Sequence, residues 1–78
     1  MSSKEKYEKV FMECFDIDQA TLTGLEYNTI EQWDSIGHME MIAELEEVFD
    51  IMLDTDDIID FSSFEIGMEI LGKYGVSF

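Results

Sequence analysis

The stretch WDSIGHMEMIAELEEVFD, residues 33–50, gives a clear indication of the fold class. Its apolar residues recur at the three- and four-residue spacing of one helix face, which predicts a helix over Ser35–Phe49. At 100° per residue one side of this helix gathers a core stripe of Met41, Ile42, Leu45, Val48 and Phe49. The opposite side carries Ile36, Met39 and Ala43, interleaved with Glu40, Glu46 and Glu47. The helix is therefore apolar on two sides, and only the first is expected to face a core.

The chain before this helix predicts one more long helix and then a long connection. A helix is expected over Ser3–Phe15, with a capping box between Ser2 and Glu5, weak support from a Glu5–Lys9 pair, and an inner stripe of Tyr7, Val10, Phe11, Cys14 and Phe15. Residues 16–34 show no sustained period. They carry spaced apolar anchors at Ile17, Leu22, Leu25, Tyr27, Ile30 and Trp33. We expect an ordered loop pinned by these anchors, with one short helical turn near residues 21–25.

The chain after this helix predicts two further helices. A short one is expected over residues 56–60, started by Asp54 or Thr55, and a last one over residues 63–74, with a capping box between Ser62 and Glu65. The inner stripe of the last helix comprises Phe64, Gly67, Met68, Leu71 and Tyr74. The sequence thus predicts a single all-α domain over residues 1–78, a small irregular four-helix bundle with a long first loop and a short third helix.

The charge balance limits the classes of partner. Nineteen acidic residues face four lysines and no arginine, for a formal net charge of -15. Such a surface repels nucleic acid and anionic lipid, and it attracts basic patches on partner proteins. The sequence holds no run of about 18 apolar residues and no apolar segment at its start, so we expect neither a membrane span nor a signal peptide. With a single cysteine, Cys14, a reducing cytoplasmic setting is expected.

Two groups of side chains could form chemical sites. Asp54, Asp56, Asp57 and Asp60 could associate weakly with divalent ions, but no specific metal site is expected. Ser35 and His38 could touch as nucleophile and base, yet neither a pocket nor an oxyanion donor is evident. We expect His38 to point toward the core as a packed or loop-bonded side chain, and we expect no enzyme activity.

Trp33-Asp34-Ser35-Ile36 resembles the phosphopantetheine attachment motif of acyl carrier proteins, of the stand-alone type. Residues 37–50, which end in Leu-Glu-Glu-Val-Phe-Asp, resemble the second helix of that family. The resemblance covers nearly the whole chain. A serine in the first turn of a helix also suits a phosphodiester, because free N–H groups and the positive end of the helix dipole lie there.

The resemblance implies a function and a set of residues. Ser35 would carry a covalent 4′-phosphopantetheine arm taken from coenzyme A, and Asp34 would support the phosphopantetheinyl transferase. The implied docking surface for acyl-transferring or acyl-modifying enzymes with basic patches is Ile36, Met39, Glu40, Glu46 and Glu47. The chain would act as a monomer that carries acyl thioesters between biosynthetic enzymes.

Two departures from the family leave the cargo open. Gly37 and His38 stand where many fatty-acid carriers have an acidic residue, and Trp33 replaces a small one. Both features resemble carriers that serve a dedicated fatty-acid, polyketide or similar pathway. Two alternatives remain: a peptidyl or aminoacyl carrier, although its usual Gly-Gly-His/Asp-Ser motif is absent, and an acidic protein-interaction module with no arm.

Overall fold

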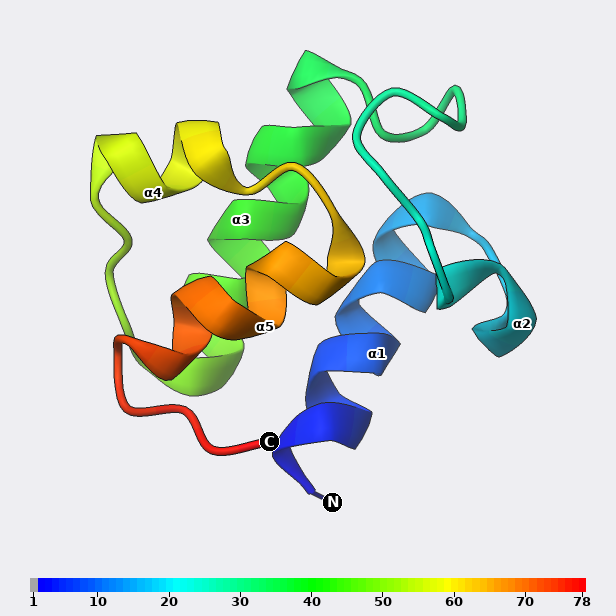
Figure 1. Ribbon diagram of the computed structural model, residues 1–78. Coiled ribbons are helices and arrows are strands. Elements are labelled where there is room, and N and C mark those ends of the chain that lie inside the picture. The colour runs from blue at the N-terminus through cyan, green and yellow to red at the C-terminus, as the bar shows by residue number, and fades with distance from the viewer. Residues whose placement is uncertain (1) are drawn as a thin grey trace.

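The computed structural model describes residues 2–78 as a small all-α bundle (Figure 1). Its helices are α1 (Ser3–Phe15), α2 (Gln19–Leu22), α3 (Ser35–Phe49), α4 (Thr55–Asp60) and α5 (Phe64–Gly72). The expected helical bundle is confirmed, and α1, α3, α4 and α5 are its four predicted helices. The helical turn expected near residues 21–25 is α2, which begins earlier because the Asp18 side chain accepts a hydrogen bond from the Thr21 N–H at 3.1 Å.

The helix caps decide where α1 and α5 begin. The Ser2–Glu5 capping box of α1 is confirmed. Because Glu5 is held there, the expected Glu5–Lys9 pair is not the one that forms, and Lys9 lies 3.9 Å from Glu13 instead. The predicted capping box at Ser62 is wrong, since Ser63 caps α5 by accepting a hydrogen bond from the Ile66 N–H at 3.0 Å.

An aromatic cluster fills the space between the helices. Phe11 lies at its centre, with ring contacts to the other members, Tyr7, Phe15, Trp33, Phe61 and Phe64. The Tyr7 hydroxyl donates to the backbone carbonyl of Phe64 at 2.7 Å, which satisfies its polar end inside the core. A Cβ added at Gly67 would collide with Tyr7 and Phe61, so α5 approaches this cluster closely only because residue 67 is glycine.

The long connection between α2 and α3 is ordered by its buried anchors. Leu22, Leu25 and Trp33 are buried as expected, whereas Tyr27 remains 41% exposed. Backbone hydrogen bonds of 2.9 Å from Tyr27 to the Ser62 carbonyl and from Phe64 to the Leu25 carbonyl tie the loop to the segment before α5. These contacts fix the direction from which the chain enters α3.

The end of α5 is tied to the start of α4. The Lys73 ammonium lies 2.7 Å from Oδ1 of Asp57, and the Tyr74 hydroxyl donates to Oδ2 of the same carboxylate. Tyr74 also accepts a hydrogen bond from the Asp54 N–H at 3.0 Å. The short helix α4 therefore has a fixed position although none of its own residues is fully buried.

Among residues 2–78 no helix is long and apolar enough to cross a membrane.

Candidate functional site

Ser35 is the first residue of α3 and is exposed to solvent. Asp34 is the N-cap, and its Oδ1 accepts a hydrogen bond from the Gly37 N–H at 2.8 Å. The Asp34 backbone carbonyl accepts a further bond of 2.8 Å from the His38 N–H. The cap leaves the Ser35 hydroxyl at the surface, beside the N–H groups that begin a 15-residue helix. An anionic group attached to this oxygen would meet the positive end of the helix dipole.

His38 links three parts of the site. Its Nδ1 lies 2.9 Å from the Trp33 indole Nε1, and its Nε2 lies 2.8 Å from the Ile58 carbonyl. An indole N–H can only donate, so Nδ1 is the acceptor and Nε2–H donates to Ile58. The expectation of a packed, loop-bonded histidine is confirmed, since the side chain is buried. With both nitrogens engaged, His38 is not free to act as a base for Ser35.

Gly37 allows the preceding loop to close over the first turn of α3. A Cβ added at this position would collide with the Gln32 carbonyl. An acidic side chain at residue 37, as in many fatty-acid carriers, would therefore not fit this loop conformation. Trp33, the residue after Gln32 in the same loop, is fully buried in the core.

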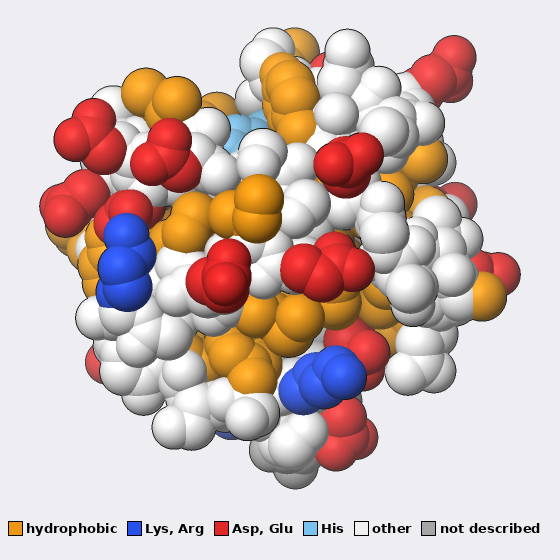
Figure 2. Space-filling model, in the orientation of Figure 1, with side chains coloured by type: hydrophobic (Ala, Val, Ile, Leu, Met, Phe, Trp, Pro, Cys, Tyr) orange, Lys and Arg blue, Asp and Glu red, His pale blue; other side chains and the backbone are white. Residues whose placement is uncertain are grey.

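A largely apolar groove opens beside Ser35. It encloses about 360 Å3 and is lined by Tyr27, Ser35, His38, Met39, Ile58, Ile59, Phe61 and Ser62. In Figure 2 the histidine, in pale blue, is a small recessed patch among orange hydrophobic side chains. The candidate attachment oxygen therefore lies at the edge of a groove that suits an apolar ligand.

The predicted docking residues lie on the outer side of α3. Ile36 is 71% and Met39 is 52% exposed, and Glu40 and Glu47 are also exposed. Glu46 differs, because it is half-buried and accepts a hydrogen bond from the Leu53 N–H at 2.8 Å. Glu46 thus holds the loop after α3 in place, and its expected part in partner steering remains a prediction.

One exposed apolar residue near the site was not predicted from the sequence. Ile59 of α4 is 72% exposed and lines the groove beside Ser35. The adjacent Ile58-Ile59 pair could have indicated this exposure, because a helix as short as α4 cannot turn two consecutive side chains toward the core. Apolar surface near Ser35 therefore comes from two helices.

The acidic cluster on α4 does not form a metal centre. Within the described part of the chain, no group of three or more His, Cys, Asp or Glu side chains is arranged to hold a metal ion. Asp57 is already occupied, and the hydrogen bonds from Lys73 and then Tyr74 lower the pKa of its carboxyl. Loose divalent association with Asp54, Asp56 and Asp60 remains a prediction.

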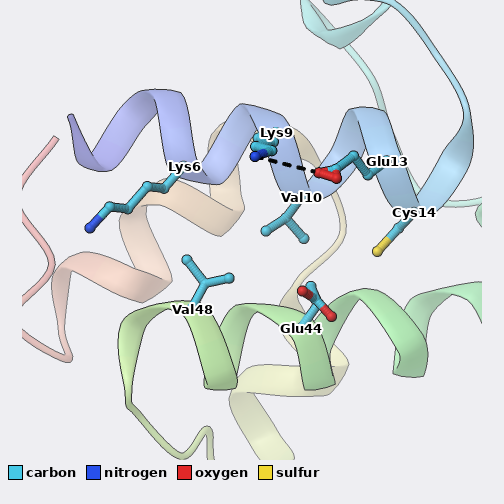
Figure 3. A pocket seen from close by; sticks show the side chains of 7 residues that line it. All are labelled: Lys6, Lys9, Val10, Glu13, Cys14, Glu44 and Val48. Atoms are coloured by element: carbon cyan, nitrogen blue, oxygen red, sulfur yellow. Dashed lines mark ion pairs between the residues drawn. The ribbon is translucent and has the colours of Figure 1, made fainter. Parts of the chain in front are cut away.

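A larger hollow of about 600 Å3 lies between α1 and α3, away from Ser35 (Figure 3). Its rim carries Lys6, Lys9, Glu13 and Glu44, so cations and carboxylates are mixed. Figure 3 shows Cys14 pointing from α1 toward α3. Burial, followed by the nearby carboxylates, raises the pKa of the Cys14 thiol, which disfavours the nucleophilic thiolate. This hollow offers no chemistry comparable to that of the Ser35 groove.

Comparisons with protein-family models, with curated proteins and with solved structures found no match for this chain. The resemblance to acyl carrier proteins therefore depends on the residues of the motif and its helix.

Proposed function

We propose that this chain is an acyl carrier protein with a 4′-phosphopantetheine arm on Ser35. The observation that carries the proposal is the position of Ser35. It is exposed at the first turn of α3, capped by Asp34, and at the edge of an apolar groove. The arm, when bound, supplies a thiol that holds an acyl group as a thioester.

The residues around Ser35 suit the attachment. Ser35 Oγ would form the new phosphodiester bond with the phosphopantetheine half of coenzyme A, while the nucleotide half leaves and the hydroxyl proton passes to the transferase. The start of α3 favours the resulting negative charge. Asp34 keeps its N-cap bond to Gly37, so the helix start retains its geometry while Asp34 supports the transferase.

The outer face of α3 supports docking to partner enzymes. Ile36 and Met39 offer apolar anchors, and Glu40 and Glu47 surround them with negative charge. Anchors of this kind supply affinity, whereas rim charges mainly raise the association rate. We infer a monomeric, cytoplasmic, non-enzymatic carrier that serves the transferase and acyl-transferring enzymes with basic docking patches, in a dedicated fatty-acid, polyketide or similar pathway.

The test is intact-mass measurement after treatment with coenzyme A and a broad-specificity phosphopantetheinyl transferase. We expect one phosphopantetheinyl addition in the wild type and none in Ser35→Ala, whose melting temperature should match the wild type because Ser35 is exposed. An unmodified wild type would favour the interaction module without an arm. Loading of the arm by an aminoacyl-activating enzyme, but not by acyl-transferring ones, would favour the peptidyl carrier.

A further inference from the structure

The groove beside Ser35 has a defined inner end. Met39 and Ile59 are exposed at its outer walls, whereas His38 and Phe61 are buried at its inner end. Its volume of about 360 Å3 is near the lower limit for a ligand pocket. An acyl chain on the thiol of the Ser35 arm reaches this groove when the arm folds back along the protein, and it then finds apolar contacts but limited room.

His38 closes the route from this groove into the core. Its hydrogen bond to the Ile58 carbonyl joins α3 to α4 across the groove, at 2.8 Å. Behind it, the Trp33 indole donates to Nδ1 of His38, lies nearly coplanar with the imidazole with ring centroids 6.2 Å apart, and is fully buried. An apolar chain that passes between His38 and Ile58 breaks their hydrogen bond and displaces the Trp33 indole.

We propose that His38 sets the upper length of the acyl chain that this protein can shelter. This inference rests on the proposed attachment at Ser35. A short or medium acyl chain lies in the outer groove against Met39 and Ile59 and ends at the His38–Ile58 link. Methylene groups beyond that point stay in water or on a partner protein, because the aromatic core holds its own side chains in close packing.

The experiment loads the protein with acetyl, hexanoyl, decanoyl and tetradecanoyl groups from the matching acyl-coenzyme A. Melting temperature reports sheltering, and the emission of Trp33, the only tryptophan, reports displacement of the core. We expect the melting temperature to rise by roughly 4–8 °C from acetyl to hexanoyl, about a third of what full burial of the four added methylene groups would give, because the groove is open to solvent. It should then level off, with Trp33 emission constant. A melting temperature that climbs through tetradecanoyl with altered Trp33 emission would overturn the proposal.

Matched variants show which residues are responsible for the stabilisation by the acyl chain. Ile59→Ser, on the groove wall, should remove most of the stabilisation by the hexanoyl group and leave the melting temperature of the unloaded protein unchanged. Met52→Ser is the control, because Met52 is 83% exposed and does not line the groove. In His38→Ala the melting temperature should continue to rise from hexanoyl to decanoyl. If His38→Ala does not fold, the wild-type acyl series and the Ile59→Ser variant test the proposal. An Ile59→Ser protein that keeps the full hexanoyl stabilisation would refute binding of the acyl chain in the groove.

Different results would contradict the proposed attachment at Ser35 and the proposed role of His38. A wild-type protein that accepts no acyl-phosphopantetheinyl group contradicts the attachment at Ser35. A protein that is loaded at Ser35 but shows no levelling with chain length contradicts only the role of His38.

Discussion

Truncation of two apolar residues on opposite sides of α3 should separate stability from docking. Leu45 is fully buried and Ile36 is 71% exposed. Leu45→Ala removes a packed core side chain and leaves a cavity, which costs about 2–5 kcal/mol. For a domain of this size each kcal/mol lowers the melting temperature by about 4–8 °C, so Leu45→Ala should melt at least about 8 °C below the wild type.

Ile36→Ala should behave differently, because the folded chain buries only a minor part of its side chain. Full burial of an isoleucine is worth about 1.5–3 kcal/mol, so the loss within the monomer stays below about 1 kcal/mol and is partly offset by the higher helix propensity of alanine. When a partner covers the exposed part of the Ile36 side chain, truncation to alanine should lower the binding free energy by about 1–2 kcal/mol. Docking should then weaken by roughly 5–30-fold.

Circular dichroism melting of both variants, beside the kcat/KM of the transferase reaction, measures these effects. We expect normal melting and a lowered kcat/KM for Ile36→Ala. If Ile36→Ala melts as low as Leu45→Ala, the two-sided helix is wrong. If it melts normally and is modified and bound by every acyl enzyme at the wild-type rate, Ile36 is exposed but does not dock.

Three further predictions concern packing and charge. Gly67→Ala should destabilise the protein by about 1–3 kcal/mol, because its Cβ would collide with Tyr7. Gly72→Ala is the control: its Cβ meets open space, so it should melt no lower than the wild type. Equal melting temperatures for both variants would refute the close approach of α5 to the aromatic cluster. Since Lys73 lowers the pKa of the Asp57 carboxyl, their bond stabilises the fold above the ordinary aspartate pKa of about 4 and is lost as pH falls toward the folded-state value. The melting difference between wild type and Asp57→Asn should therefore be constant from pH 7 to about 5 and shrink in stronger acid, whereas a difference that persists at pH 2 would contradict this role. Melting temperature should also rise with NaCl, and more steeply with Mg²⁺ at equal ionic strength, because a net charge of -15 repels itself; indifference to both salts would show that the carboxylates are already compensated.

The local patterns were the most predictable part of the fold. The bounds of α3 agree with the sequence, because its caps and its apolar period lie within one continuous segment. The start of α5 was placed on the wrong serine. Ser62 and Ser63 both precede it, and Glu65, which suggested a capping box with Ser62, accepts a hydrogen bond from the Gly24 N–H instead. That partner is 41 residues away, and no local rule could identify it.

The candidate site was predictable in its residues but not in its surroundings. The motif selected Ser35 as the candidate attachment residue, which the structure shows exposed at the start of α3, and the helix period placed Ile36 on the outer side of α3. The link from Trp33 through His38 to the Ile58 carbonyl was not foreseeable, because it depends on where α4 lies in space. The exposure of Ile59, which completes the groove, depends on the same packing.

The modification state of Ser35 in the protein's own cells shows whether this residue carries the arm. The measurement is mass spectrometry of the protein purified from its native source, followed by fragmentation of the peptide that contains residues 33–50. We predict a 4′-phosphopantetheinyl group on Ser35, free or acylated, in a substantial fraction of the molecules. An unmodified Ser35 in every molecule, from cells in which other carrier proteins bear the arm, would contradict it.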